Sequence, residues 1–204
     1  MRIIIVSDNN IVSNSNNEKA ISAGAVHSGL SARDTALIGL FAALMAVCSW
    51  ISIPASVPFT MQTFGVFLTI GLLGGKRGTL AVLVFLLMGA IGLPVFSGFT
   101  GGLGHILGVT GGYITGFLFS ALLMWLIESL AGRSIPVLTA SMAAGLLVCY
   151  AFGTAWFMTV YAKQSGPIGL TAALSMCVLP YIIPDLCKIA LAVLLTKRLR
   201  PHIG

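Results

Sequence analysis

Long apolar stretches constrain this chain more than any other feature of its sequence. A helix needs about 20 predominantly apolar residues to cross the hydrocarbon core of a bilayer. Five such blocks lie at about 35–53, 59–75, 78–97, 112–131 and 136–160, and a sixth region at about 168–196 is interrupted by Pro180 and Pro184. Only 8% of the 204 residues are charged, against about 25% in a soluble domain. We therefore predict an all-α integral membrane protein with six transmembrane helices.

Basic residues are distributed unequally between the two sides of this predicted bundle. If the six spans alternate in direction, one side carries only Lys163. The other carries Arg33, Lys76, Arg77, Arg133, Lys197, Arg198 and Arg200. Because Lys and Arg accumulate on the cytoplasmic side, we expect a multi-pass protein of the cell membrane with both termini in the cytoplasm. Topology also explains the net charge of +6, so we expect no nucleic-acid partner.

The polar residues before the first block suggest a boundary. We interpret residues 1–31 as a mobile cytoplasmic N-terminal tail rather than a signal peptide, and residues 32–200 as the six-helix membrane domain. The four cysteines lie inside apolar blocks and form no CxxC pair. They indicate neither a disulfide framework nor a zinc site.

Two charges lie inside the last apolar region. Asp185 and Lys188 are three residues apart, so on a helix they share a face. Ionisable groups within a span are costly and usually functional. We interpret them as a ligand-binding pair; the alternative is an internal ion pair that holds the helices together. A helix that starts at Pro184 would place Asp185 in its first turn near the outer face, with a separate short helix over residues 169–179, whereas one long kinked helix would place it deeper.

A glycine-rich connection lies on the predicted outer side. Seven glycines lie between Gly98 and Gly112, and glycine permits positive φ and close backbone approach. Such a loop is suited to cover a ligand, although it can also be a plain connector. Tyr113 follows the loop directly, which favours its contact with a ligand.

No enzymatic motif is complete. The stretch "LGGKRG" (73–78) differs from a Walker A loop, since Ile70 stands where a glycine is required and Arg77 replaces the Ser/Thr. A single histidine away from the tails, His105, cannot supply a histidine pair for zinc. An intramembrane serine protease using Ser97 and His105 remains a remote alternative. We predict no enzyme activity, no cofactor and no metal.

Four stretches of this sequence together resemble the BioY family. They are "VPFTMQTFGVFL" (57–68), "LLGGKRG" (72–78), "GAIGLPVFSGFTGGLGHILGVTGGYITGF" (89–117) and "PDLCKIALA" (184–192). The resemblance covers about residues 34–196 in order. It implies an S-component-like bundle: a biotin-binding S component of an energy-coupling factor (ECF) transporter, which captures biotin at the outer face. The implied partners are a transmembrane coupling protein and two cytoplasmic ATPases, which drive the uptake.

The resemblance also implies roles for particular residues. Asp185 and Lys188 would contact the vitamin. We expect Asp185 to meet the ureido N–H groups and Lys188 the carboxylate, with Lys188 at the ureido oxygen as the alternative. The outer loops would cover the ligand, and the residues expected to contact it there are Phe96, Gly98, Gly101, Gly102 and Tyr113. Many family members have Asn where this chain has Gly98, so any contact of that side chain is not carried over.

Small residues on the first span suggest how the chain meets its partner. Ala42 and Ala46 are four residues apart, and this spacing allows helices to approach closely in lipid. The resemblance implies that this pattern is where the coupling protein docks. The alternative is that these alanines pack between the chain's own helices. The second functional alternative is a standalone carrier, proton-coupled through Asp185.

Overall fold

The structure is a computed structural model that describes residues 30–203 except residues 55–56. The tail predicted for residues 1–31 therefore lies almost entirely outside the described residues. The chain divides into two units, Met1–Arg33 and Asp34–Gly204, and the elements that build the site belong to the second.

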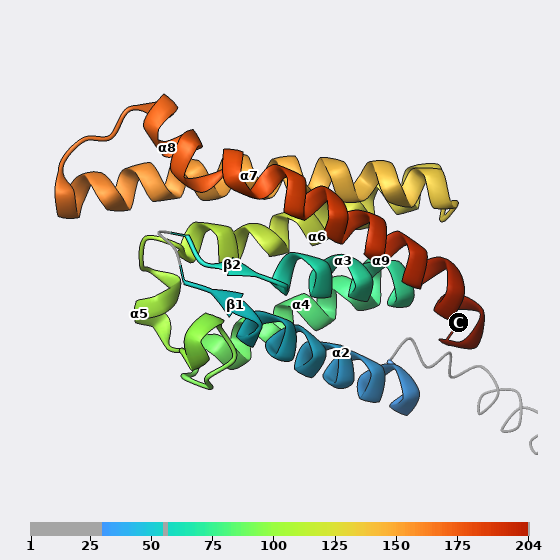
Figure 1. The fold of residues 1–204 in the computed structure, drawn as a ribbon. Coiled ribbons are helices and arrows are strands. Elements are labelled where there is room, and N and C mark those ends of the chain that lie inside the picture. The colour runs from blue at the N-terminus through green and yellow to red at the C-terminus, as the bar shows by residue number, and fades with distance from the viewer. Residues whose placement is uncertain (1–29, 55–56, 204) are drawn as a thin grey trace, which may run out of the picture. The chain divides into compact units, whose positions relative to one another are not determined.

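The described residues are predominantly helical (Figure 1). The α-helices are α2 (Ala32–Trp50), α3 (Gln62–Leu73), α4 (Gly75–Ala90), α5 (Leu103–Ile106), α6 (Gly111–Ala131), α7 (Ile135–Ser165), α8 (Leu170–Cys177) and α9 (Ile182–Ile203). Two 3₁₀ helices, η1 (Ser97–Phe99) and η2 (Leu179–Tyr181), lie in the connections. Strands β1 (Ser52–Ile53) and β2 (Phe59–Thr60) form a short antiparallel hairpin, with Ser52 opposite Thr60. The sequence analysis did not predict this hairpin.

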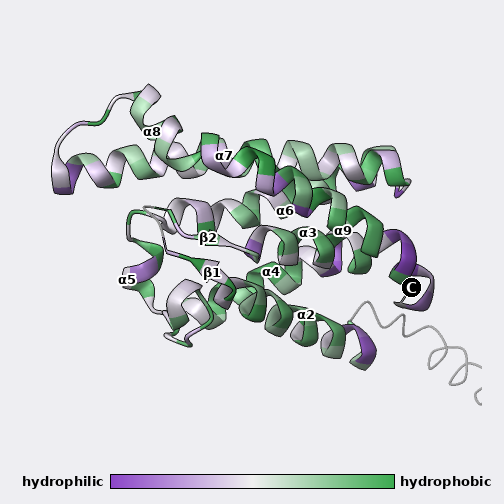
Figure 2. Ribbon diagram, viewed as in Figure 1, coloured by the Kyte–Doolittle hydropathy of each residue, from purple (hydrophilic) through white to green (hydrophobic). Residues whose placement is uncertain are grey.

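Four helical segments are long and apolar enough to cross a membrane: α2, α6, α7 and the region Leu170–His202. Figure 2 shows green, hydrophobic residues along these helices and purple, hydrophilic residues at the start of α2 and in the last turns of α9. The predicted second and third spans are shorter, with 12 residues in α3 and 16 in α4. All residues of α3 except Phe64 are buried, so this short helix packs against protein instead of lipid.

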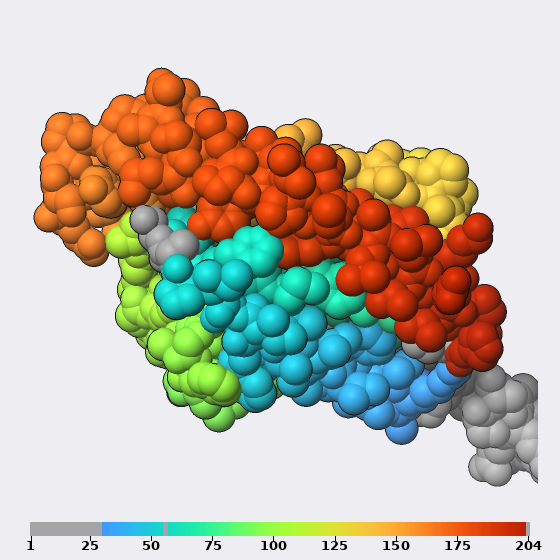
Figure 3. Space-filling view, viewed as in Figure 1, coloured from blue at the N-terminus to red at the C-terminus, as the bar shows by residue number. Residues whose placement is uncertain are grey.

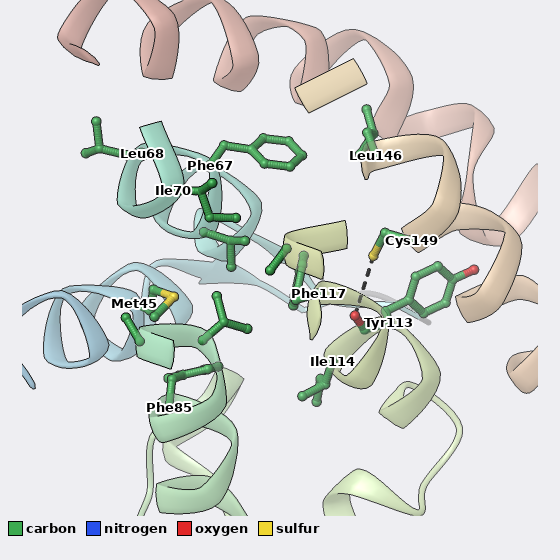
Figure 4. Close-up of a cluster of buried hydrophobic side chains, with 14 of the residues drawn as sticks. Met45, Phe67, Leu68, Ile70, Phe85, Tyr113, Ile114, Phe117, Leu146 and Cys149 are labelled. Carbon is green, nitrogen blue, oxygen red and sulfur yellow. Dashed lines mark hydrogen bonds between the residues drawn. The ribbon is translucent and has the colours of Figure 1, made fainter. Parts of the chain in front are cut away.

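The core lies where α3, α4, α6 and α7 pack on one another. Phe67 and Ile70 of α3, Phe85 of α4 and Phe117 of α6 are buried there (Figure 4). α6 lies along α7, and α3 contacts both α4 and α9; Figure 3 shows the red surface of α9 against the cyan-green surface around α3. Apolar interdigitation of this kind holds the helices in one arrangement.

The small residues of α2 face in two directions. Ala42 is 0% exposed and Ala46 is 4% exposed, and α2 comes so close to α3 that a Cβ on Gly65 would lie 3.1 Å from the Cβ of Cys48. The burial of both alanines favours packing between the chain's own helices over docking of a partner. Gly39 and Ala43, by contrast, are exposed.

The proline-containing region forms two helices instead of one. α8 ends at Cys177, η2 contains Pro180, and α9 begins at Ile182 with Pro184 in its first turn. The prediction of a separate short helix before the last span is confirmed, although α9 starts two residues earlier than Pro184. Proline is tolerated there because the first turn of a helix needs no N–H donor from it.

At the end of the bundle that carries the basic residues, α4, α6, α9 and the connection between α6 and α7 are joined by polar contacts. Glu128 pairs with Arg133 at 3.2 Å and accepts a 2.8 Å hydrogen bond from the backbone N–H of Gly75, where α4 begins. Arg200 donates to the carbonyl of Arg133 at 2.7 Å. A carboxylate therefore already caps α4 at the stretch that superficially resembles a phosphate-binding loop.

Candidate functional site

A cavity of about 620 Å³, counted with the space at its open mouth, lies at the other end of α9. Its lining comes from the hairpin, α3, α6, α7, α8 and α9: Val57, Pro58, Thr60, Gln62, Thr63, Ser97, Thr110, Tyr113, Ile114, Phe117, Leu146, Cys149, Tyr150, Cys177, Tyr181, Asp185 and Lys188.

Asp185 and Lys188 form the polar centre of this cavity. The ammonium of Lys188 lies 2.7 Å from Oδ1 of Asp185, and each side chain is only 5% exposed. Their spacing on α9 places them one turn apart on the same face. Asp185 lies in the first turn of α9, where the helix dipole stabilises a carboxylate. The hydroxyl of Tyr150 on α7 donates to the second oxygen, Oδ2, at 2.5 Å.

Lys188 also ties α9 to the hairpin. Its ammonium donates to the carbonyl of Thr60 at 2.6 Å and lies 4.2 Å from the ring centroid of Phe59. The ring of Tyr181 stacks on Phe59, and its hydroxyl donates to the carbonyl of Val57. The charged pair therefore has partners on two other elements, α7 and β2, and a buried ion pair requires such further partners.

Tyr113 reaches the cavity from the first turn of α6. Its hydroxyl is 3.0 Å from Oγ1 of Thr154 on α7, and its carbonyl accepts from the thiol of Cys149, the dashed line in Figure 4. Gly153 makes room for the ring, because a Cβ at this position would lie 2.2 Å from it. Of the residues predicted to bind ligand, Asp185, Lys188 and Tyr113 are brought together here.

The other predicted contacts lie in the glycine-rich loop, outside the described lining of the cavity. Phe96 is fully buried, in edge contact with Phe85 and stacked on His105. Gly98 and Gly102 have positive φ, 69° and 94°. A Cβ on Gly101 would lie 2.2 Å from the carbonyl of Leu93. These residues shape the loop, which reaches the cavity through its neighbours Ser97 and Thr110.

Hydrogen bonds from helices anchor this loop at several points. Ser49 donates to the carbonyl of Val95 at 2.7 Å, and the indole of Trp50 donates to that of Pro94 at 2.8 Å. The indole of Trp156 donates to the carbonyl of Gly108 at 3.0 Å. The loop is thus fixed to both α2 and α7, beside the cavity mouth.

His105 takes part in this anchoring. Its Nδ1 is 3.1 Å from the hydroxyl of Thr100, and burial lowers the pKa of the ring, which keeps it neutral at pH 7. Within residues 30–203, apart from 55–56, no hydrogen bond joins it to Ser97, as a serine protease would require. In the same part of the chain, no three His, Cys, Asp or Glu residues gather to hold a metal ion.

Sequence reasoning missed several polar groups of the cavity. The sequence predicts no ligand contact for Tyr150, Gln62 or Tyr181. Their partners are 35 residues away for Tyr150 and 124 residues away for Tyr181. A polar Gln62 at the start of an apolar block is a signal in the sequence for a polar site. Whether this residue lines a cavity, however, depends on which elements surround it in the fold.

The arrangement defines a membrane protein that binds a small molecule in a cavity between apolar helices. A donor and an acceptor lie side by side in a largely apolar chamber, the composition typical of ligand sites. The described side chains at the cavity are suited to recognising a ligand by hydrogen bonds.

Comparison with known proteins places this chain in a family. The BioY family model matches residues 17–204. The chain is 40% identical over 172 residues to a probable biotin transporter BioY of Pyrococcus horikoshii, covering 84% of this chain and 98% of that protein. It is 41% identical over 163 residues to the biotin transporter BioY of Thermotoga maritima, covering 79% and 92%. The chain belongs to the BioY family.

A solved structure has the same fold. It is a crystal structure at 2.1 Å of the S-component for biotin from an ECF-type ABC transporter. The similarity has a TM-score of 0.72 and 26% sequence identity, and it covers 97% of this chain and 95% of that one.

The contact between Tyr150 and Asp185 yields a first prediction. Tyr150→Phe removes the hydroxyl that donates to Oδ2 and leaves a buried carboxylate oxygen without that donor. We expect a loss of about 1–3 kcal/mol in stability, measured by thermal unfolding of the purified protein in detergent. Tyr161→Phe is the matched control, because this α7 tyrosine stacks on Phe157 and is not among the described lining residues. Equal melting temperatures for both variants would contradict the prediction.

Proposed function

We propose that this chain is the biotin-binding S component of an ECF-type importer. The proposal is supported by the names of its relatives and by the S-component structure that it resembles. The observation that carries it is the buried Asp185–Lys188 pair in the lining of a cavity that opens to the surface. Biotin offers N–H donors and a carbonyl in its ureido ring, an apolar body, and a carboxylate at the end of its tail.

The geometry of the pair indicates which end of biotin it meets. The two charges are in direct contact, so a group that contacts one also lies close to the other. A carboxylate at Lys188 would be repelled by Asp185. A cyclic urea presents N–H and C=O side by side and matches the pair. We therefore favour Asp185 at a ureido N–H and Lys188 at the ureido oxygen, the alternative orientation of the sequence analysis.

Substitution of either partner tests this proposal. Asp185→Asn and Lys188→Met each leave a buried group uncompensated, a cost of roughly 2–5 kcal/mol, which corresponds to about 30-fold or more in affinity. Titration of labelled biotin into monodisperse variants measures the loss. Near-wild-type affinity in both variants would show that the pair is structural.

An uncharged biotin ester separates the two orientations. If Lys188 meets the ureido oxygen, Lys188→Met loses affinity for the ester and for biotin by the same factor. A loss confined to biotin would instead place the carboxylate at Lys188.

We further propose six spans with both termini in the cytoplasm, and residues 32–200 as the membrane domain. The joining of Gly75, Glu128, Arg133 and Arg200 at one end of the bundle supports this orientation, because it gathers the basic loops. The cavity then opens at the outer face, since Asp185 lies 13 residues before Arg198 on α9, roughly 20 Å away.

Cysteine labelling tests this topology. Cysteines introduced at Lys76 and Arg133 should react with an impermeant reagent only after the membrane is permeabilised, whereas one at Lys163 should react in intact cells. Equal labelling of the Lys76 and Lys163 variants in intact cells would exclude the proposed orientation.

The proposed partners are a transmembrane coupling protein and two cytoplasmic ATPases. The S-component structure, from an ABC-type transporter, favours this module over a standalone carrier. The exposed side of α2 offers Gly39 and Ala43, four residues apart, for close helix approach. We place the contact here rather than at the predicted Ala42 and Ala46, because both alanines are buried among the chain's own helices.

Leucine substitutions distinguish the two sides of α2. Ala43→Leu should leave biotin affinity and melting temperature unchanged and reduce biotin uptake by cells that contain the complete module. Ala42→Leu should instead lower the melting temperature, because extra volume in a packed core costs about 1–3 kcal/mol. Normal uptake with Ala43→Leu would contradict docking through this side.

A further inference from the structure

Gln62 has an unsatisfied group inside the cavity. It is the first residue of α3, it is 4% exposed, and it is one of the residues that line the cavity. Its backbone N–H donates to the hydroxyl of Thr60 at 3.2 Å. Its side-chain amide nitrogen is buried and has no hydrogen-bond partner among the described residues. A buried amide without a partner is destabilising, so its presence in this lining needs an explanation.

Within the part of the chain that the structure describes, no acceptor lies within hydrogen-bonding distance of this amide nitrogen. Oδ1 of Asp185 accepts from Lys188 and Oδ2 accepts from Tyr150. The carbonyl of Thr60 accepts from Lys188. Gln62 therefore adds donors to a cavity whose described carboxylate already has a donor on each oxygen. The missing component is an acceptor, which a ligand oxygen would supply.

We propose that Gln62 is a ligand-binding residue whose side-chain amide donates a hydrogen bond to the ureido oxygen of biotin. This inference rests on the proposed function. Gln62 follows two residues after Thr60, whose carbonyl accepts from the ammonium of Lys188, and all three residues line the same cavity. A urea oxygen has two lone pairs and can accept from both donors.

This assignment gives Gln62 a role in specificity. An amide donor and an ammonium donor directed at one oxygen reject a ligand that carries N–H groups at that position. The guanidino analogue 2-iminobiotin is such a ligand, because it is protonated at neutral pH and lacks the acceptor. A site built to pair one polar group discriminates strongly against an analogue without it.

Affinity measurements on Gln62→Met test the inference. Methionine keeps the length of the side chain and removes both donors. We expect biotin and its methyl ester to bind about fivefold to tenfold more weakly, by the same factor, since one hydrogen bond is lost. The affinity for 2-iminobiotin should not fall. Gln62→Glu is a second variant, which has an acceptor in place of the donors. Its ratio of affinity for 2-iminobiotin to affinity for biotin should be higher than that of the wild type.

Thermal unfolding of the ligand-free protein separates a binding role from a structural role. Gln62→Met removes an unpaired buried amide, so its melting temperature should equal or exceed that of the wild type. Thr79→Val is the matched control: this buried hydroxyl donates to the carbonyl of Ala121 at 3.2 Å. The control should melt at a lower temperature and bind biotin normally.

Several outcomes would overturn the inference. Unchanged biotin affinity in both Gln62 variants would remove Gln62 from the site, and so would a lowered melting temperature of Gln62→Met with normal affinity. A loss limited to the free acid would assign Gln62 to the carboxylate and contradict its contact with the ureido oxygen. If the wild-type protein bound no biotin, the proposed function would fail first, which is a distinguishable result.

Discussion

The buried ion pair of Asp185 and Lys188 organises the cavity end of this molecule. Two charges removed from water are costly, and their mutual attraction offsets this cost only when further hydrogen bonds satisfy them. Here Tyr150 on α7 and the Thr60 carbonyl on β2 supply those bonds. The pair therefore connects the last helix to both the hairpin and α7. Any ligand that contacts it also contacts the elements that form the cavity wall.

The two ends of the bundle use charge in different ways. At the basic end, Glu128 pairs with Arg133 and caps α4 through the N–H of Gly75, so its carboxylate is satisfied by the protein itself. At the cavity end, Gln62 keeps an unpaired amide. Such an unpaired group in a cavity lining is expected where a ligand supplies the missing partner.

The glycine-rich loop is held in place by packing and hydrogen bonds, and most of its residues do not line the cavity. Phe96 fills the space beside Gly89, where a Cβ would lie 2.0 Å from its ring, and bonds from Ser49, Trp50 and Trp156 hold the backbone. A loop fixed at so many points presents Ser97 and Thr110 to the cavity in defined positions, and this lowers the entropy cost of binding.

The sequence by itself determined the membrane class and the order of the apolar segments, and it singled out Asp185 and Lys188 as charges on one helix face; before the last span it left a separate short helix and one long kinked helix both open. These follow from local properties: apolar length, charge in an apolar context, proline position and three-residue spacing. The family resemblance supplied the ligand class. Only the tertiary structure decided that Ala42 and Ala46 are buried, that α8 is separate from α9, that the hairpin supplies Thr60, and that Tyr150 and Gln62 line the cavity. Those facts depend on contacts between distant segments, such as the 35 residues between Tyr150 and Asp185, and helical periodicity does not show which neighbour a face meets.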